Sequence, residues 1–224
     1  ERLFPDLRQE DFTQLTTSIQ RLPGSIRIAS YNVNGCLLES ASAGSPSPLQ
    51  QLAWLFHHLG LDFLMIQEHR IPAPRLAEFY SALATIGTLP TPEGGRSARP
   101  LEGFISPATQ AGEGGCLILC AAGWTPRHPR HTPLPNGRGQ LLEVCGQGEK
   151  RLLLANVYGK AAAANSFAAL HEAEAIFAQA ASTIKPYLEP SRNRVLILGG
   201  DLNAPWTLGV DRHLPIPPSR TQPG

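Results

Sequence analysis

The 224 residues of this chain include 42% hydrophobic and 17% charged side chains, a balance that is typical of a folded globular domain and excludes disorder throughout. The formal net charge is only +1, so the chain lacks the basic excess of a protein that coats nucleic acid, and any nucleic-acid contact must be local. No apolar run approaches the roughly 20 residues that a membrane-spanning helix needs, and we expect no membrane partner.

The cysteines and the first residue indicate the setting of the chain. The cysteines form no CxxC pair and no zinc pattern, and three of them lie in apolar runs, so we expect buried free thiols. Reduced thiols favour an intracellular location, with the nucleus as one candidate. The chain begins at Glu1 and its single methionine is Met65, so we expect it to be part of a longer polypeptide. The four cysteines are Cys36, Cys116, Cys120 and Cys145.

The first part of the chain predicts a strand, a helix and a second strand. Residues 26–33 (IRIASYNV) alternate between apolar and polar side chains, which predicts a strand. Ser47 is a good N-cap for a helix with apolar spacing that begins at Pro48 and ends at Gly60. Residues 62–68 (DFLMIQE) are nearly all apolar and end in polar residues, as expected of a strand that is buried on both faces.

The middle of the chain is less regular. Residues 79–86 predict a helix, the glycine- and proline-rich residues 87–113 predict an extended loop, and residues 114–120 (GGCLILC) predict a strand. Residues 124–139 form the most basic stretch and contain several prolines, which leaves two interpretations, a solvated surface loop or a loop that contacts phosphate. The candidates for substrate binding in this stretch are Arg127, Arg130 and Arg138.

The second part predicts a hairpin, a long helix and a last strand. Residues 140–145 and 151–158 have the pattern of two strands joined by the turn GQGEK. A polar residue at 165–166 can cap an alanine-rich helix that reaches about Tyr187. Residues 194–203 (RVLILGGDLN) predict another buried strand that ends in polar residues.

Strands that alternate with helices predict an α/β (α+β) chain in which the strands form a layered core and the helices lie outside. We assign residues 1–24 to an N-terminal extension, within which residues 11–21 have a weak helical pattern. Residues 25–204 are assigned to one domain. Residues 205–224 contain five prolines and no periodicity, so we expect an irregular tail.

Polar side chains follow three of the apolar strands at the points where the strands end. The first strand ends in Asn32 and Asn34, the second ends in Gln67, Glu68 and His69, and the last ends in Asp201 and Asn203. Taken singly, such residues have an ordinary interpretation, because Asn and Asp often serve in turns. A carboxylate at the end of a buried strand is nevertheless costly unless it binds something, and polar groups from several strand ends can form one pocket. Carboxylate and amide oxygens suit a hard divalent ion such as Mg²⁺, which can polarise a phosphate.

Four short strings, taken together, resemble one protein family: SYNVNG (30–35), IQEHR (66–70), ANVY (155–158) and GGDLN (199–203). They occur in the order of the endonuclease/exonuclease/phosphatase superfamily. That superfamily includes exonuclease III and other apurinic endonucleases, DNase I, inositol-polyphosphate 5-phosphatases and the endonuclease domains of LINE-type retrotransposons. The resemblance implies a four-layer α/β/β/α sandwich of the DNase I-like type and a phosphodiesterase that depends on Mg²⁺ or Mn²⁺.

The resemblance also implies a role for each matching residue. Glu68 would bind the metal ion together with Asn34 and Asn32. Asn32 would also support the substrate phosphate. In apurinic endonucleases the position of Asn34 is often Asp.

The catalytic residues implied by the resemblance are Asn32, Tyr158, Asp201 and Asn203. Tyr158 would contact the scissile phosphate. Asp201 would orient or activate the attacking water, and Asn203 would hold a phosphate oxygen in the transition state. In physical terms this is metal-assisted attack of water on a phosphodiester, in which the amides and the metal stabilise the added charge.

Two features depart from the family pattern. The family often has Ala-Pro-Asn after the tyrosine, whereas here Tyr158 is followed by Gly159, Lys160 and four alanines. The family ends with an Asp and a Ser-Asp-His string, whose histidine is essential to the chemistry. Here 21 residues follow Asn203, and His213 has no Ser-Asp before it. We therefore expect the last strands to be missing, an exposed apolar edge, and weak or no turnover by this chain.

Three functions remain open at this point. A DNA endonuclease of the retrotransposon or apurinic type is favoured by the Asn-Val-Asn-Gly string, by Tyr158 and by the basic stretch, with DNA expected as the partner rather than RNA. A phosphatase acting on inositol phosphates or phospholipids would use the same metal site, but no basic amphipathic helix or aromatic membrane loop supports it. The missing terminal segment would also fit a degenerate domain that binds without catalysis.

Overall fold

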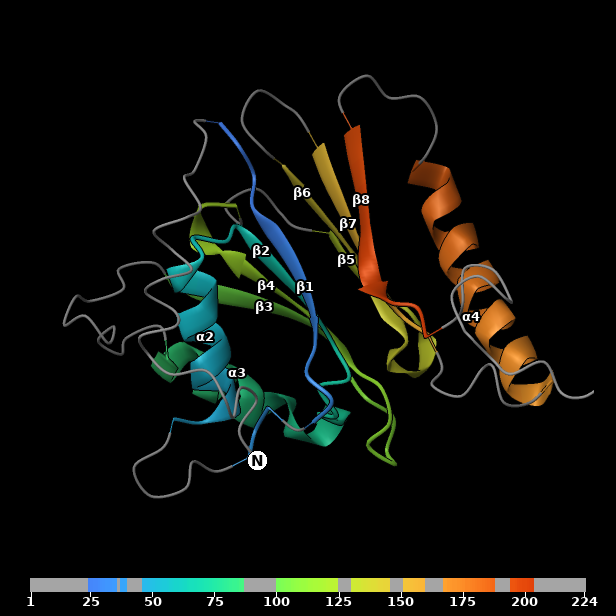
Figure 1. The fold of residues 1–224 in the computed structure, drawn as a ribbon, viewed down its shortest axis with the longest axis horizontal. Coiled ribbons are helices and arrows are strands. Elements are labelled where there is room, and N and C mark those ends of the chain that lie inside the picture. The colour runs from blue at the N-terminus through green and yellow to red at the C-terminus, as the bar shows by residue number, and fades with distance from the viewer. Residues whose placement is uncertain are drawn as a thin grey trace, which may run out of the picture.

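The computed structural model describes residues 24–35, 37–39, 46–86, 100–124, 130–145, 151–159, 167–187 and 194–203. Two β-sheets pack face to face, with helices α2 and α3 on one outer side and helix α4 on the other (Figure 1). This is the expected four-layer α/β/β/α sandwich of the DNase I-like type. The expected helix over 11–21, residues 1–23 of the expected extension and the whole expected tail lie outside the described residues.

The first sheet has the strand order β1-β2-β4-β3. β1 (Ile28–Asn32) runs parallel to β2 (Phe63–Gln67), and helix α2 (Pro48–His58) lies between them in the chain, as the crossover between parallel strands requires. β4 (Cys116–Ala121) is antiparallel to β2 and to β3 (Leu101–Ser106). The predicted strands over 26–33, 62–68 and 114–120 are confirmed as β1, β2 and β4.

Helix α2 begins where the sequence predicts. The Ser47 hydroxyl accepts a hydrogen bond from the Gln50 backbone N–H over 3.2 Å, and the Gln50 side chain accepts from the Ser47 N–H over 2.7 Å. This reciprocal pair satisfies two N–H groups that would otherwise have no partner at the start of the helix. Pro48 occupies the first turn, where no intrahelical N–H bond is lost.

The prediction of an extended loop over 87–113 is wrong for residues 101–106, which form β3. Gly103 stands in the middle of this strand and weakens its apolar pattern. A Cβ atom at Gly103 would lie 2.9 Å from the Leu83 side chain of helix α3 (Leu76–Ile86), so the close approach of the helix favours glycine. The hydrogen bonds that make this segment a strand come from β4, which periodicity alone does not reveal.

The second sheet has the strand order β5-β6-β7-β8. β6 (Gly139–Cys145) and β7 (Arg151–Tyr158) form the predicted antiparallel pair. β8 (Arg194–Asp201) runs parallel to β7 and follows the long helix α4 (Phe167–Ile184) in the chain. β5 (Arg130–Pro133) is an edge strand antiparallel to β6.

β5 corrects a second expectation, because it lies inside the basic stretch 124–139 that was predicted to be a loop. Pro133 cannot donate a backbone hydrogen bond, which restricts proline in a sheet to an edge position such as this one. Residues 135–137 then form a single turn of 3₁₀ helix before β6 begins. The pairing with β6 therefore makes a short strand out of residues that have no strand pattern of their own.

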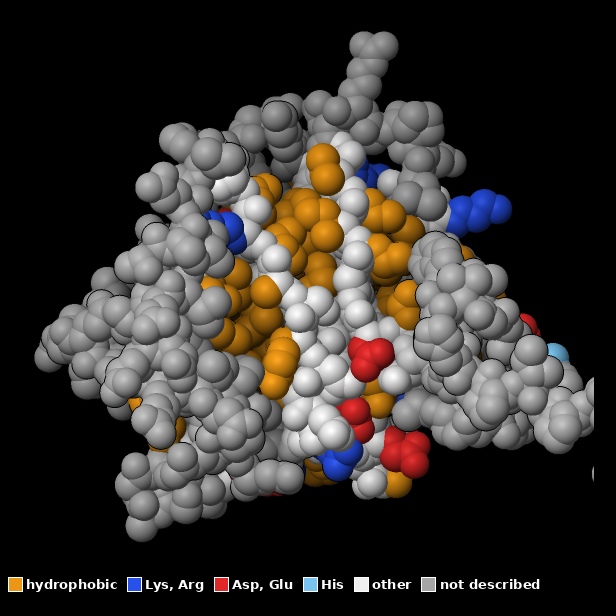
Figure 2. Space-filling view, in the orientation of Figure 1, with side chains coloured by type: hydrophobic (Ala, Val, Ile, Leu, Met, Phe, Trp, Pro, Cys, Tyr) orange, Lys and Arg blue, Asp and Glu red, His pale blue; other side chains and the backbone are white. Residues whose placement is uncertain are grey.

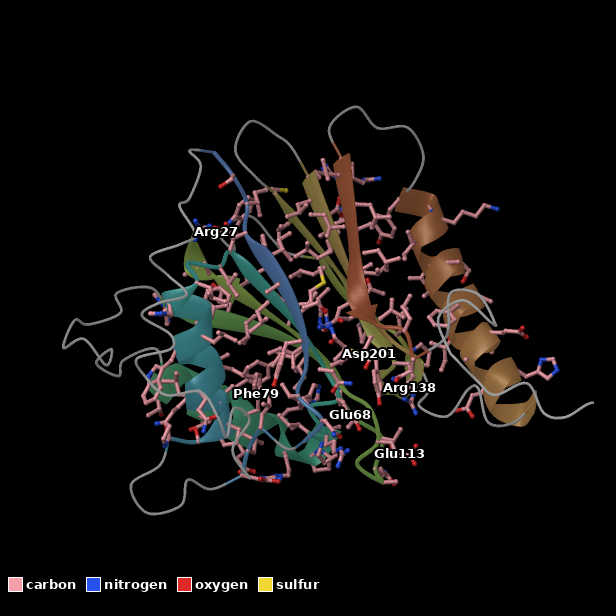
Figure 3. The ribbon with its side chains drawn as sticks, viewed as in Figure 1. Arg27, Glu68, Phe79, Glu113, Arg138 and Asp201 are labelled. Atoms are coloured by element: carbon pink, nitrogen blue, oxygen red, sulfur yellow. The ribbon has the colours of Figure 1, made fainter. Side chains whose placement is uncertain are left out.

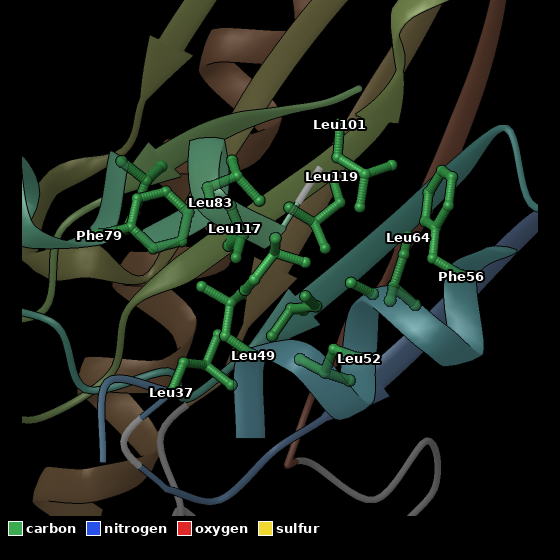
Figure 4. Packing of buried hydrophobic residues seen from close by; sticks show 14 of the residues in the cluster. Leu37, Leu49, Leu52, Phe56, Leu64, Phe79, Leu83, Leu101, Leu117 and Leu119 are labelled. Atoms are coloured by element: carbon green, nitrogen blue, oxygen red, sulfur yellow. The ribbon is translucent and has the colours of Figure 1, made fainter. Parts of the chain in front are cut away.

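The side chains of the inner strands point alternately to the two faces of each sheet and so contribute to three apolar layers, one between the sheets and one under the helices on each outer side. On β2, Phe63 and Met65 face the second sheet, whereas Leu64 and Ile66 face helices α2 and α3 (Figure 4). Full burial of each such side chain contributes about 1.5–3 kcal/mol. The layer between the sheets is completed by Ile118, Cys120, Leu142, Val144, Leu152 and Leu154, and α4 covers Leu141, Leu153, Ala155 and Val157 on the other side.

β1 and β8, the edge strands of the two sheets, lie side by side on one face of the molecule (Figure 1). Apolar side chains gather on this face over both sheets, as Figure 2 shows. On β8, Val195 is 54% exposed and Leu198 is 57% exposed. The exposed apolar edge that the sequence predicts is therefore present.

Two smaller expectations concern the thiols and the membrane. Cys116 and Cys120 are buried free thiols and Cys145 is a partly buried one, as expected, while Cys36 lies outside the described residues. Within the part of the chain that the structure describes, no helix is long and apolar enough to cross a membrane.

Candidate active site

Polar side chains from four strands meet at one end of the sandwich (Figure 3). In the parallel pair β1–β2, Asn32 lies opposite Gln67, and in the parallel pair β7–β8, Tyr158 lies opposite Asp201. The two sheets join at this end, because the Asn32 side-chain NH₂ donates a 2.7 Å hydrogen bond to Asp201 Oδ2. These two residues are 169 positions apart in the chain, so only the packing of one sheet on the other brings them together.

Both carboxylate oxygens of Asp201 are held. Oδ2 accepts from Asn32, and Oδ1 accepts from the backbone N–H of Asn203 over 3.0 Å. The Asn203 side chain donates to the Gly159 carbonyl over 3.2 Å, which ties the end of β8 to the end of β7. Asp201 is only partly buried, so a carboxylate of fixed orientation faces a site that solvent can reach.

The two glycines before Asp201 are required by close packing. A Cβ atom at Gly200 would overlap the backbone of Val157 on β7, and the residue has a φ of +145°. A Cβ atom at Gly199 would lie 2.6 Å from the Met65 sulfur on β2. The Gly-Gly pair therefore lets β8 approach both its neighbour and the opposite sheet just before the catalytic candidate.

Glu68 follows β2 in a left-handed conformation with a φ of +59°. The pairing of β1 with β2 continues beyond the strands, since the Gly35 N–H donates to the Glu68 carbonyl over 3.2 Å. Arg70 folds back over this turn. Its Nη2 donates to Glu68 Oε1 over 2.7 Å and to Asn34 Oδ1 over 2.8 Å.

Tyr158 is almost completely buried, and its hydroxyl is hydrogen-bonded to Glu68. Burial raises the pKa of the Tyr158 phenol to about 12, and the negative charge of Glu68 acts in the same direction. The guanidinium carbon of Arg138 lies 5.2 Å from the centre of the Tyr158 ring. Arg138 is itself buried, and its Nη2 lies 3.7 Å from the carboxylate of the exposed Glu113. The phenol thus stays protonated beside a fixed cation.

The donors at this end of the sheets fit a hard divalent cation. Glu68 Oε1 and Asn34 Oδ1 both lie within hydrogen-bonding distance of one cationic nitrogen of Arg70, so the two oxygens converge on a single point. Oxygen donors of this kind suit Mg²⁺ or Mn²⁺, and Mg²⁺ usually keeps several waters. In the described ranges no cluster of three His, Cys, Asp or Glu side chains occurs, so amide oxygens and water would complete the shell.

Asn32, whose role as a metal ligand stays a prediction, contacts two other site residues. Its amide oxygen accepts from the Asn34 N–H over 2.8 Å, and its NH₂ holds Asp201. The structure therefore uses both ends of this amide to organise neighbouring site residues.

The structure brings together most of the residues that the sequence singled out. Arg130 on β5 is an exception. It lies opposite Glu143 of β6, about 13 Å along the strand from Gly139, where β6 begins next to the site. Arg127 lies outside the described residues. The residues that do meet are Asn32, Asn34, Glu68, Arg138, Tyr158, Asp201 and Asn203.

A buried amide pair beneath the site was not foreseen from the sequence. The Asn156 NH₂ donates to the Ile66 carbonyl over 2.9 Å and to the Leu117 carbonyl over 3.1 Å, both in the opposite sheet. Its oxygen accepts from the Gln67 side chain over 2.7 Å, and the same Gln67 nitrogen also contacts the Ser30 hydroxyl over 3.0 Å. Asn156 is fully buried in the ANVY string, two residues before Tyr158, and a polar residue in such an apolar run was the available signal.

His69 stands at the end of the second predicted strand, but the sequence assigned it no role. Its Nδ1 accepts from the Ile71 N–H over 2.9 Å, so Nε2 carries the proton and donates to the Ser106 carbonyl over 3.2 Å. A Cβ atom at Gly115 would lie 2.5 Å from the ring, which shows how tightly the imidazole is enclosed. Burial lowers the pKa of His69 to about 4. The neutral ring supports the loop that carries Glu68 and Arg70.

The layered fold, with an oxygen-lined site at its strand ends, is that of the DNase I-like structural class. The chain belongs to the endonuclease/exonuclease/phosphatase family, whose model matches residues 29–223. This family comprises metal-dependent phosphodiesterases, nucleases and phosphatases. No curated protein sequence matches the chain significantly.

Several solved structures share the fold. The AP endonuclease LMAP from Leishmania major is 13% identical, with a TM-score of 0.53 over 87% of this chain and 66% of that one. The 3′ phosphatase NExo from Neisseria, bound to a product DNA hairpin, is 19% identical, with a TM-score of 0.51 over 80% of this chain and 58% of that one. TDP2 from C. elegans is 15% identical, with a TM-score of 0.45 over 70% of this chain and 42% of its own. This chain thus spans less than two thirds of each of these proteins, and the likeness to the first two shows the fold.

Proposed function

We propose that this chain carries the catalytic site of a divalent-metal-dependent endonuclease that hydrolyses phosphodiester bonds in DNA, of the apurinic or retrotransposon type. The hydrogen bond between Asn32 and Asp201 carries the proposal, because it closes one site from the edge strands of two different sheets. Glu68 and Tyr158 belong to the same constellation through their mutual hydrogen bond. Polar side chains that converge from separate strand ends are typical of a binding or catalytic site.

Glu68 and Asn34 are the residues that would hold the cation, since their oxygens converge on one point. Mg²⁺ is the first choice and Mn²⁺ the alternative. Such an ion, when bound, supplies Lewis-acid stabilisation of the charge that develops on the phosphate and the leaving oxygen.

The protein groups have separate tasks in the proposed reaction. Asp201 is held by Asn32 and by the Asn203 N–H. It takes a proton from the attacking water while the water oxygen forms its bond to phosphorus. The bond from phosphorus to the leaving oxygen then breaks, and that oxygen takes a proton from solvent. Asn203 would turn its amide to a phosphate oxygen in the transition state, in exchange for the Gly159 carbonyl that it contacts in the structure.

Tyr158 and Arg138 would bind the phosphate. The raised pKa of Tyr158 keeps its hydroxyl protonated at neutral pH, so it is a hydrogen-bond donor and not a base. Arg138 supplies a positive charge that its burial and its contact with the Tyr158 ring hold in place. Arg127 and Arg130 remain proposed as more distant contacts for the nucleic-acid backbone.

DNA is the proposed substrate for two reasons. The net charge of +1 requires that cations be concentrated at the site, and Arg138 is a buried cation there. The Neisseria phosphatase, which has the same fold, is bound to a DNA hairpin. An RNA and an inositol phosphate should be tested beside the DNA, because cleavage of either in preference to DNA would contradict the choice of substrate.

Nicking of supercoiled plasmid, intact and depurinated, tests the proposal in Mg²⁺ at high protein concentration. We expect slow nicking that EDTA abolishes and that Asp201→Asn reduces by about a hundredfold or more, the usual range for loss of a general base. Glu174→Gln on the exposed face of α4 removes a carboxylate of equal charge elsewhere and should leave nicking unchanged. A folded chain that binds Mn²⁺ but cleaves neither plasmid would refute the catalytic proposal and leave a binding domain.

A further inference from the structure

Arg70 lies where a cation would lie between the two proposed metal ligands. A single nitrogen, Nη2, is 2.7 Å from Glu68 Oε1 and 2.8 Å from Asn34 Oδ1. The Glu68 side chain is only 18% exposed, whereas the Arg70 side chain is 43% exposed. The oxygens therefore belong to the body of the site, and the guanidinium reaches them from a side chain that solvent partly surrounds.

The backbone that carries these oxygens is held in place without the Arg70 side chain. Asn34 and Glu68 both have left-handed backbone conformations, with φ of +41° and +59°. The Gly35 N–H donates to the Glu68 carbonyl, and the Asn34 N–H donates to the Asn32 side chain over 2.8 Å. The loop after β2 is anchored further by the Arg70 N–H, which donates to the Gly114 carbonyl over 3.1 Å. Removal of the Arg70 side chain would leave all of these backbone contacts in place.

We propose that Arg70 is a built-in competitor for the divalent cation. Its guanidinium must leave Glu68 and Asn34 before a metal ion can bind their oxygens, so Arg70 sets the metal affinity of the site. This inference rests on the proposed function, because it takes Glu68 and Asn34 as the metal ligands. Arg70 is the group that would move, because its charge repels a bound cation and its partly exposed arm can turn into solvent.

Competition and positioning predict opposite effects of the same substitution. If Arg70 only oriented Glu68 for the metal, its removal would disorder the ligand and weaken metal binding. If Arg70 competes, its removal takes away both a bound cation and a like charge next to the site, and metal binding becomes tighter. The sign of the change in Kd therefore separates the two roles without any measurement of activity.

Mn²⁺ binding to the full 224-residue chain, measured by calorimetry and by electron paramagnetic resonance, tests the inference. We expect Arg70→Gln to lower the Kd for Mn²⁺ about tenfold, which corresponds to about 1.4 kcal/mol. Arg70→Lys keeps a positive charge and should stay within about threefold of the wild-type Kd. Arg75→Gln is the matched control, because Arg75 is similarly exposed, pairs with Glu78 over 2.7 Å and should leave the Kd unchanged.

Residue 70 has a φ of +56°, so a second variant, Arg70→Asn, uses a residue that tolerates this conformation better than most non-glycine residues and guards against misfolding. It should also tighten binding. Unchanged or weaker binding by both variants, with binding that Glu68→Gln abolishes, would overturn the competitor role and leave the proposed metal site standing. Absence of Mn²⁺ binding in the wild type and in both variants would overturn the metal site and the inference together.

Discussion

Asn156 is expected to hold the two sheets in register directly beneath the site. Substitution by alanine removes its two donated hydrogen bonds, to the Ile66 and Leu117 carbonyls, and the one it accepts from Gln67. The residue is completely buried, so water cannot replace these contacts without opening the space between the sheets. Gln67 keeps its contact with Ser30, which limits the loss on that side.

The three lost bonds set the size of the effect. A net contribution of about 1 kcal/mol for each hydrogen bond gives a loss of about 3 kcal/mol in the free energy of unfolding. For a chain of this length each kcal/mol lowers Tm by about 2–4 °C, so Asn156→Ala should melt about 6–12 °C below the wild type. Asn156→Asp should be less stable still at pH 7, because a carboxylate cannot donate to the two carbonyls and is buried without a cation.

Thermal and urea unfolding followed by circular dichroism measure this change. Gln179→Ala on the exposed face of α4 is the matched control, since it removes an amide of similar polarity from a solvated position and should alter stability by less than about 0.5 kcal/mol. A Tm for Asn156→Ala within about 2 °C of the wild type would show that the amide pair does not join the sheets as its geometry indicates.

Two further predictions concern the loops next to the site. Gly115→Ala should destabilise the fold more than Gly112→Ala, although both glycines have a positive φ. A Cβ atom at Gly115 would lie 2.5 Å from the His69 ring, whereas one at Gly112 would meet nothing within 4 Å. Equal unfolding free energies for the two variants would contradict this prediction. The pKa of His69 is about 4 in the folded chain, against an ordinary value of 6.5, so between these pH values the unfolded chain binds a proton on His69 and the folded chain does not. The free energy of unfolding should therefore fall by up to about 3 kcal/mol as the pH drops from 6.5 to 4, and His69→Gln should lack this component. Urea titrations at pH 7, 5.5 and 4.5 give the slope of the unfolding free energy against pH for the wild type and for His69→Gln. Identical slopes for the two proteins would show that the imidazole is not buried as a neutral ring.

The sequence alone was sufficient for the elements that carry their own pattern. The alternation in 26–33, the apolar run in 62–68 and the N-cap at Ser47 are local signals, and each produced the expected strand or helix. The motif strings also located Glu68 and Asp201 at strand ends. These features were predictable because hydrogen-bond periodicity and side-chain alternation are properties of short segments.

The tertiary structure decided the features whose stabilising partners lie far away in the chain. β3 and β5 are strands because β4 and β6 supply their hydrogen bonds, although Gly103 and Pro133 obscure the local pattern. At the site, the contact of Asn32 with Asp201 and the burial of Arg138 against Tyr158 depend on how the sheets and their connecting loops pack. A strand-end residue can be recognised from its neighbours in sequence. Its partner depends on the packing of one sheet against the other, which no local pattern encodes.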